Sequence, residues 1–127
     1  MEKNTGLYLG TEINEKWWRR YMRDGMFARG NGEYWWDDQG FYFIRYLTKK
    51  PIFIPFSKAY KTKLGTWHSG RWCMGNFIVK ILWQKDDLRL SSGFLISKYK
   101  EDAVRLESEL QDKITRGRSP RYQANNK

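Results

Sequence analysis

The sequence is poor in the two residue types on which many metal sites and active sites depend. It contains one cysteine, Cys73, and one histidine, His68, in 127 residues. A single cysteine excludes an intramolecular disulfide and is typical of a reducing compartment. A structural zinc site needs about four such ligands, so the sequence predicts none. A catalytic triad would have to use His68, and no nucleophile-elbow motif accompanies it.

Long apolar segments are absent as well. No run approaches the roughly 20 residues that span a bilayer. Residues 1–18 lack the basic start, apolar middle and small-residue cleavage site of a signal peptide. The glycine-containing stretch at residues 29–32 lacks the lysine and hydroxyl residue of a phosphate-binding loop. We therefore expect a cytoplasmic, non-catalytic protein without a cofactor or a metal ion.

Aromatic residues and positive charge are abundant instead. Seven Trp, eight Tyr and seven Phe make up 17% of the chain, and such side chains favour strands. Lys and Arg outnumber Asp and Glu by 24 to 14, which gives a net charge of +10. This charge either serves solubility alone or attracts an anionic partner such as an acidic protein, an acidic membrane or nucleic acid.

Between residues 33 and 97 the apolar residues alternate with a period of two, which predicts strands. Aromatic runs on both sides of the acidic loop 37–40 predict a β-hairpin. Pro55 marks an edge strand or a kink, and Gly93 indicates a bulge or a bend. The predicted strands are 7–9, 33–36, 41–47, 52–54, 57–64, 77–84 and 88–97, with a tight turn over 67–72.

Two segments have helical spacing. Near the C-terminus one apolar stripe recurs every three or four residues, followed by Gly117 as a C-terminal cap. Near the N-terminus, Thr11 as a start and Gly25 as a stop favour a helix, although residues 16–21 are also compatible with an extended strand. The stripe consists of Tyr99, Ala103, Leu106, Leu110 and Ile114.

These patterns predict a single domain with a mostly β, β+α fold. Residues 1–32 form an N-terminal extension, helical or extended, that packs on the domain. Residues 33–116 form the domain itself and end in the amphipathic helix. Residues 117–127 carry basic groups without any acid and form a flexible tail.

The order of short strands closed by one helix resembles a pleckstrin-homology-like (PH-like) domain, the architecture shared with GRAM-type domains. The resemblance covers about residues 33–115, and three segments carry it: the 32–43 hairpin, the Lys49–Phe56 segment, and the 77–96 strands that run into Glu101-Asp102-Ala103. The resemblance implies an antiparallel β-barrel of about seven strands in two nearly perpendicular sheets, with the helix plugging the open end.

The same resemblance raises the question of a phosphoinositide ligand. In lipid-binding members, basic residues gather in the loop between the first two strands. The loop that matches it in this sequence is Asp37-Asp38-Gln39-Gly40, which is acidic. An acidic loop repels phosphate, so we do not expect a phosphoinositide ligand. Many domains of this architecture bind proteins, and a shared fold does not give a shared function.

The turn around Trp67, His68, Arg71 and Trp72 is the leading candidate for a binding site. Two indoles, an imidazole and a guanidinium within six residues have the composition of an interface hot spot. An exposed His68 would make binding depend on pH between about 5 and 8. The alternative is a hairpin whose Trp side chains fold into the core.

Two further groups of basic residues are candidates. Arg19 and Arg20 follow a Trp pair and suit an anionic or planar ligand, unless the Trp side chains pack on the barrel and the Arg side chains point to water. Lys61 and Lys63 share one side of a strand, where they serve either binding or protection of a sheet edge.

Three functions follow from these observations. The leading hypothesis is a non-catalytic interaction module whose partner is a protein or an acidic surface. A nucleic-acid-binding domain that uses basic and aromatic groups is the alternative, although no known nucleic-acid motif is present. A small enzyme is the remote third.

Overall fold

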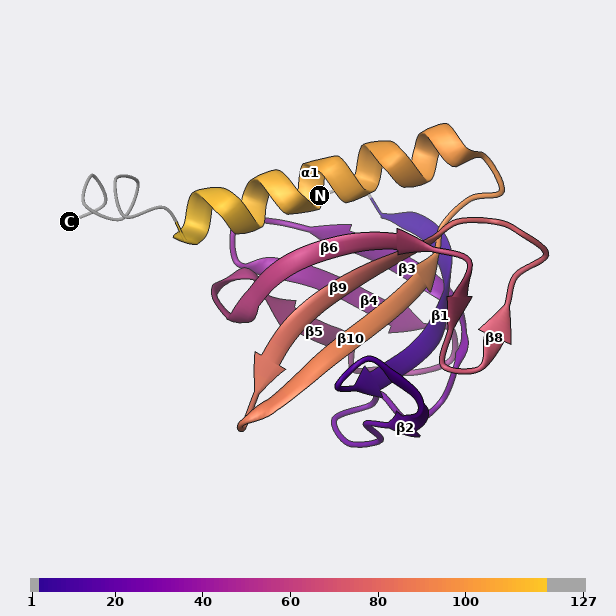
Figure 1. Cartoon of the computed structure of the whole chain (residues 1–127), viewed down its shortest axis with the longest axis horizontal. Helices are drawn as coiled ribbons and strands as arrows, with labels where there is room; N and C mark the ends of the chain where they lie inside the picture. Colours follow the sequence, from indigo (N-terminus) through magenta and orange to yellow (C-terminus); the bar gives the residue numbers. More distant parts are fainter. Residues whose placement is uncertain (1–2, 119–127) are drawn as a thin grey trace.

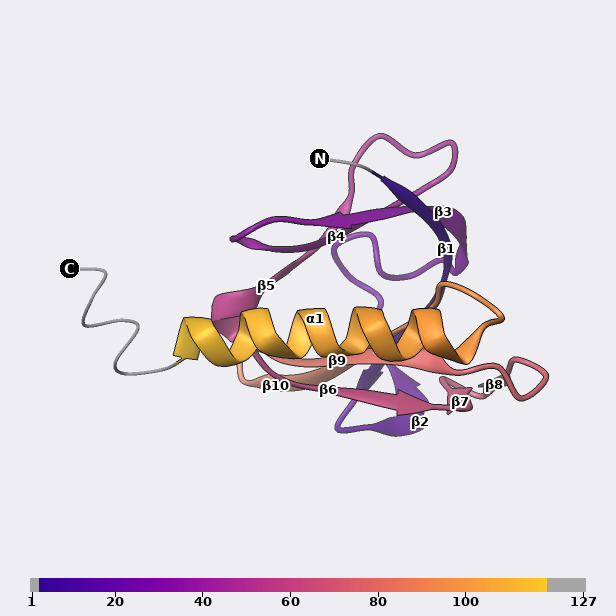
Figure 2. The ribbon, with the colours of Figure 1, turned by 90° about the horizontal axis from the view of Figure 1, so that it is seen from above.

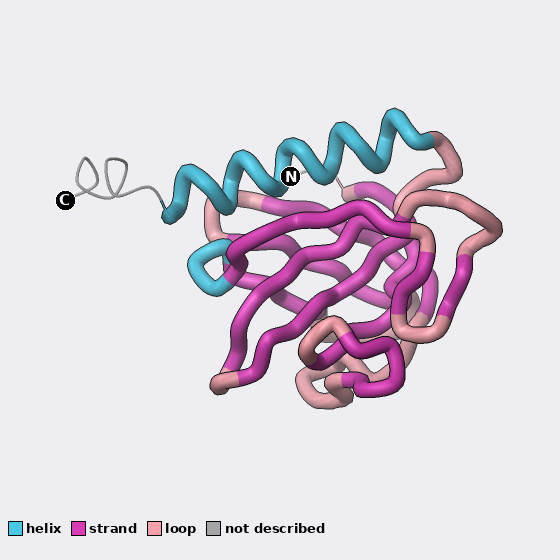
Figure 3. Tube along the Cα trace, in the orientation of Figure 1, coloured by secondary structure: helices cyan, strands magenta, loops and turns pink. Residues whose placement is uncertain are grey.

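The computed structural model describes residues 3–118, which form an antiparallel sheet with one long helix (Figure 1). The helix lies along one side of the strands, and a short hairpin projects from the opposite side (Figure 3). The elements are β1 (Asn4–Ile13), β2 (Lys16–Arg20), β3 (Gly30–Trp36), β4 (Gly40–Arg45), β5 (Ile52–Pro55), a 3-10 turn (Phe56–Lys58), β6 (Ala59–Gly65), β7 (Trp67–His68), β8 (Arg71–Trp72), β9 (Ile78–Lys85), β10 (Leu88–Leu95) and α1 (Lys100–Arg118).

Eight strands form one continuous sheet in the order β5-β4-β3-β1-β10-β9-β6, with β2 paired to β1. The sheet bends, so that β3 and β4 lie in one layer and β6, β9 and β10 in another (Figure 2). The strands β7 and β8 form a separate two-stranded sheet. The mostly β fold with one C-terminal helix is confirmed, but the closed barrel of about seven strands is wrong, because the sheet stays open between β5 and β6.

The helix predicted over residues 11–24 is wrong, and the extended alternative describes this segment. The strand β1 turns at Asn14 and Glu15, which both have positive φ, and returns as β2. The strand β1 pairs with β10 on one side and with β3 on the other, so residues 4–13 lie in the middle of the sheet rather than in an extension packed on it. Backbone pairing along both edges of β1 outweighs the i, i+4 spacing of a few apolar side chains.

The remaining strand predictions are confirmed within a few residues. The β3–β4 hairpin closes over the acidic loop, where Asp37 Oδ1 accepts hydrogen bonds from the backbone N–H groups of Gln39 and Gly40. Pro55 ends β5, the terminal strand of the sheet order. The bulge predicted at Gly93 lies on the partner strand: the register shifts between Tyr8 and Gly10, opposite Gly93.

The predicted C-terminal helix is confirmed, and α1 buries its stripe of Ala103, Leu106, Leu110 and Ile114 against the sheet. Tyr99 lies before the helix and is exposed, so its assignment to the stripe is wrong. The helix also continues through Gly117, which is therefore not its cap, and most of the predicted flexible tail, residues 119–127, lies outside the described residues.

The helix covers one edge of the sheet as well as its interior. The strand β6 ends the sheet order, and the backbone N–H of Thr62 on this strand donates a hydrogen bond of 2.9 Å to Gln111 Oε1 of α1. The Thr62 hydroxyl also donates to the carboxylate of Glu107. A backbone group that would attract a further strand is thereby satisfied inside the fold. In the described part of the chain, no helix is long and apolar enough to cross a membrane.

Candidate binding surface

The turn predicted over residues 67–72 is confirmed as a hairpin in which Trp67 pairs with Trp72 and His68 with Arg71. Ser69 and Gly70 form its two-residue turn with φ values of 50° and 78°, the backbone that twisted two-residue hairpins require. The Trp67 and Trp72 side chains are each 59% exposed, and Arg71 is exposed as well. The alternative in which these Trp side chains fold into the core is therefore wrong.

The histidine of this hairpin is buried. His68 Nε2 lies 2.9 Å from the carbonyl oxygen of Gly10, and its ring lies over Gly93, where a Cβ would be only 2.4 Å from His68 Cδ2. Burial lowers the pKa of His68 from 6.5 to about 4, so the ring is neutral at pH 7. His68 Nδ1 lies 3.6 Å from Glu12 Oε1, too far for a hydrogen bond. His68 anchors the hairpin, and a pH-dependent contact through an exposed His68 is not available.

Two further contacts hold the hairpin on the sheet. The backbone N–H of Ser69 donates a hydrogen bond of 2.7 Å to Glu12 Oε2, and Arg29 Nη2 donates one of 2.5 Å to the Ser69 carbonyl oxygen. Glu12 is a buried residue of β1. Because a buried carboxylate needs hydrogen-bond donors, the Ser69 N–H stabilises both Glu12 and the turn. The exposed side chains of the hairpin are thus presented on a fixed backbone.

The β2 hairpin lies against the β7–β8 turn. A Cβ at Gly70 would be 3.4 Å from Trp17 Cε3. Figure 2 shows β2, β7 and β8 on the same side of the sheet, away from β3 and β4. Trp17 and Trp18 are 61% and 62% exposed, and their rings meet edge to face at 5.7 Å. The prediction that they pack on a barrel is wrong. We refer to Trp17, Trp18, Trp67 and Trp72 as the tryptophan patch.

Three arginines gather beside the tryptophan patch. Arg20 Nη2 donates to the Phe27 carbonyl oxygen at 2.9 Å, and the positive charges of Arg20 and Arg71 act on Arg29. Burial, followed by these two charges, lowers the pKa of Arg29. Among residues 3–118 neither these arginines nor Arg19 forms an ion pair with a carboxylate. We refer to Arg20, Arg29 and Arg71 as the arginine cluster.

Several polar atoms in the same region are buried without a hydrogen-bond partner in the part of the chain that the structure describes. They are Arg20 Nε, Arg29 Nε, His68 Nδ1 and Ser69 Oγ. A Cβ at Gly10 would lie 3.1 Å from both Arg20 Nε and Ser69 Oγ, so the lack of a side chain at this position lets these groups approach β1. Two of these atoms are guanidinium nitrogens, whereas His68 Nδ1 is an acceptor, because the neutral ring carries its hydrogen on Nε2 toward the Gly10 carbonyl oxygen.

The two predicted lysines lie on β6 rather than in the tryptophan patch. Lys61 is exposed, whereas Lys63 Nζ pairs with Glu15 Oε1 at 2.6 Å, in the turn between β1 and β2. The pair links β6 to the turn of the β1–β2 hairpin. Sequence reasoning missed Glu12, Arg29 and Trp17 as parts of one region, because only the pairing of β1 with distant strands brings them together.

The acidic loop that argued against a phosphoinositide ligand has a different place in the fold from the one expected. It connects β3 and β4, whereas the first two strands are β1 and β2. The loop therefore carries no information about phosphate binding between the first two strands. Among residues 3–118, no three His, Cys, Asp or Glu side chains lie close enough together to hold a metal ion.

Comparison with known families agrees with this architecture. Residues 1–114 match the family described as bacterial PH domain-like. The chain belongs to the bacterial PH domain-like family. The match begins at residue 1, so in this PH-like domain the β1 and β2 segments belong to the family region together with the later strands. No curated protein matches the chain. The PH-like family is one of binding modules in general, and it specifies no ligand for this member.

Proposed function

We propose that this PH-like domain is a non-catalytic binding module that recognises an acidic protein through the tryptophan patch and the arginine cluster. The observation that carries the proposal is the exposure of four indoles, 59–62% each, on two hairpins that touch. Trp and Arg are the residue types most enriched among interface hot spots. Adjacent large apolar side chains exposed to water are typical of an interaction site.

The charges favour a partner that carries carboxylates. Arg19 and Arg71 are exposed and have no carboxylate partner among the described residues. A guanidinium can donate two parallel hydrogen bonds to one carboxylate, which gives both affinity and orientation. Since Glu12, Arg29 and Gly10 already hold the β7–β8 hairpin in place, binding would order few additional groups.

Single-stranded nucleic acid is the second candidate. Trp17 and Trp18 are exposed beside Arg19, and in single-strand binding proteins bases stack on aromatic rings while arginine contributes cation–π contacts. The two candidates differ in their response to salt. Affinity for nucleic acid falls steeply between low and moderate salt, whereas affinity for a protein held mainly by indole contacts falls much less.

Affinity capture from the native cell extract, with and without nuclease, tests the proposal. We compare the unmodified protein with Trp67→Ser and Arg71→Glu, and with Tyr99→Ser and Arg105→Glu as matched controls away from the tryptophan patch. Tyr99 is 59% exposed, like Trp67, and Arg105 lies on α1. We expect an acidic protein that resists nuclease and decreases at least about tenfold with either patch variant.

Equal capture by patch and control variants would refute the proposal. Loss of the partner on nuclease treatment would assign the tryptophan patch to nucleic acid instead. Melting curves of all four variants accompany the capture, because a large loss of stability in Trp67→Ser would mean that Trp67 supports the fold.

A further inference from the structure

The strand β5 has a free edge. It ends the sheet order, so in the described residues no strand pairs with its outer side. The backbone N–H of Phe56 donates a hydrogen bond of 3.0 Å to the carbonyl oxygen of Gln39, toward β4. Since the direction alternates along an antiparallel strand, the N–H and C=O of Phe53 point away from β4. Pro55, which has no N–H, lies at the next outward position, where proline is tolerated.

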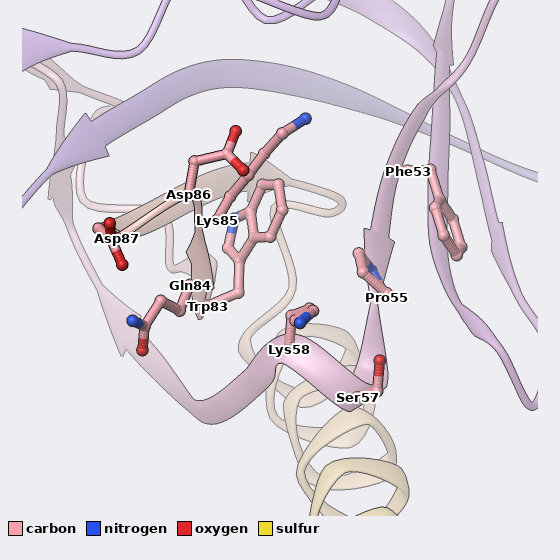
Figure 4. Close-up of a pocket in the computed structure, with 9 residues that line it drawn as sticks. All are labelled: Phe53, Pro55, Ser57, Lys58, Trp83, Gln84, Lys85, Asp86 and Asp87. Atoms are coloured by element: carbon pink, nitrogen blue, oxygen red, sulfur yellow. The ribbon is translucent and has the colours of Figure 1, made fainter.

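A groove of about 660 Å³ runs along this free edge (Figure 4). Phe53 and Pro55 form one wall, and the β9–β10 turn forms the other, with Trp83 between them. A second hollow of about 360 Å³ shares Phe53 and Lys85 with the first and extends past Pro51. The groove therefore follows the whole of β5, at the place where the sheet stays open.

An aromatic ladder crosses the outer face of the sheet and ends at this groove. Trp35 stacks on Tyr42 at 5.2 Å, and Tyr42 contacts Phe53 at 4.8 Å, one ring from each of β3, β4 and β5. Lys3 Nζ lies 4.9 Å from the Trp35 ring and covers the far end. Phe53 is 40% exposed and has no further ring beside it in the described residues. Cross-strand aromatic pairs stabilise sheets, so one more strand would extend the ladder.

We propose that an extended segment of a partner protein adds to the sheet along β5 and places an aromatic residue beside Phe53. At about 3.3 Å per residue, a groove along the four residues of β5 accommodates roughly four to six residues. Lys50 and Lys58 lie near the two ends of β5 and form no ion pair among the described residues. Acidic residues on both flanks of the aromatic residue complement these two lysines, and a basic residue complements Asp86 and Asp87, which line the other wall of the groove.

The occupant is a single extended segment rather than a second copy of this chain. The β9–β10 turn with Asp86 and Asp87 bounds the far side of the groove, so pairing of β5 with a second β5 would bring an entire domain against that turn. The proposal concerns a different surface from the tryptophan patch and does not rest on the proposed function.

Selection from a displayed library of random heptapeptides, followed by titration of one enriched synthetic peptide, tests the inference. Amide NMR of the full chain reports the site of binding. We expect enriched peptides that combine an aromatic residue with flanking acidic residues and a basic residue that faces Asp86 and Asp87, and protection of the Phe53 amide from hydrogen exchange. Phe53→Pro removes the outward N–H and should weaken binding at least about tenfold. Phe53→Thr keeps that N–H and removes the ring, which should weaken binding about threefold to tenfold.

Phe27→Thr is the matched control, since Phe27 is an exposed ring that does not line the groove. It should bind as the unmodified protein does, and the amide spectrum of each variant verifies that it is folded. Three outcomes overturn the inference: a library without enriched peptides, an enriched peptide that binds Phe53→Pro with unchanged affinity, and a Phe53 amide protected only through dimerisation of the chain. None of them bears on capture through the tryptophan patch.

Discussion

The contact between His68 and Gly93 decides whether the β7–β8 hairpin stays on the sheet, and Gly93→Ala tests it. A Cβ at residue 93 would lie 2.4 Å from Cδ2, 2.6 Å from Cγ and 2.8 Å from Nε2 of the His68 ring. These distances are far inside van der Waals contact, and the ring is fully buried, so it must move as a whole. The hydrogen bond of Nε2 with Gly10 would then be lost.

The expected cost has two parts. Overpacking in a buried site costs about 1–3 kcal/mol. Loss of the hydrogen bond with Gly10 adds about 0.5–1.5 kcal/mol. We therefore expect Gly93→Ala to lower the free energy of unfolding by about 2–4 kcal/mol in urea at pH 7. As His68 becomes exposed, its pKa should rise from about 4 toward the ordinary value of 6.5.

Two comparisons separate this mechanism from a general effect of alanine. Gly65→Ala on β6 meets only the flexible end of Lys80 and should cost less than about 1 kcal/mol. Adding His68→Ala to Gly93→Ala removes the ring that the new methyl group strikes, so the double variant should lose less stability than the two single losses combined. A Gly93→Ala protein with unchanged stability and a His68 pKa still near 4 would refute the packing described here. Since His68 is the only histidine, its NMR titration needs no assignment.

Three other predictions concern stability. Leu110→Ala should cost about 2–5 kcal/mol, because α1 buries Leu110 against the sheet, whereas Val104→Ala on the exposed side of the helix should cost much less. A denaturant titration that shows a Leu110 effect under about 1 kcal/mol would contradict this. Because folding lowers the His68 pKa, the neutral ring contributes its full stability above about pH 6.5, and up to about 3 kcal/mol of the free energy of unfolding is lost as the pH falls to about 4. His68→Asn should lack this pH-dependent loss. Curves of unfolding free energy against pH that run parallel for the variant and the unmodified protein would contradict this prediction. From its polar sequence, removal of residues 119–127 should leave the melting temperature unchanged, and a decrease of about 5 °C or more would show that they dock.

Local sequence patterns predicted the β7–β8 turn but not the burial of each of its side chains. Clustered Trp and Arg around residues 67–72 indicated a turn but left open whether its Trp side chains are exposed or buried, and the structure shows Trp67, Arg71 and Trp72 exposed on a hairpin. The same composition left the exposure of His68 open as well. The side chain is buried because Gly93, on a strand 25 positions later, lacks the Cβ that would exclude it. A residue that is close in space and distant in sequence leaves no local signal.

The sequence by itself determined the type and order of most elements. Alternating apolar residues between 33 and 97 specify strands, and the stripe from Ala103 to Ile114 specifies α1, because each pattern places apolar groups on one face of a regular backbone. Only the tertiary structure decided that residues 4–20 are strands, that the sheet stays open beside β5, and that two hairpins meet at Gly70. Backbone pairing and close packing between distant segments fix these features, and such contacts depend on the whole fold rather than on any window of the chain.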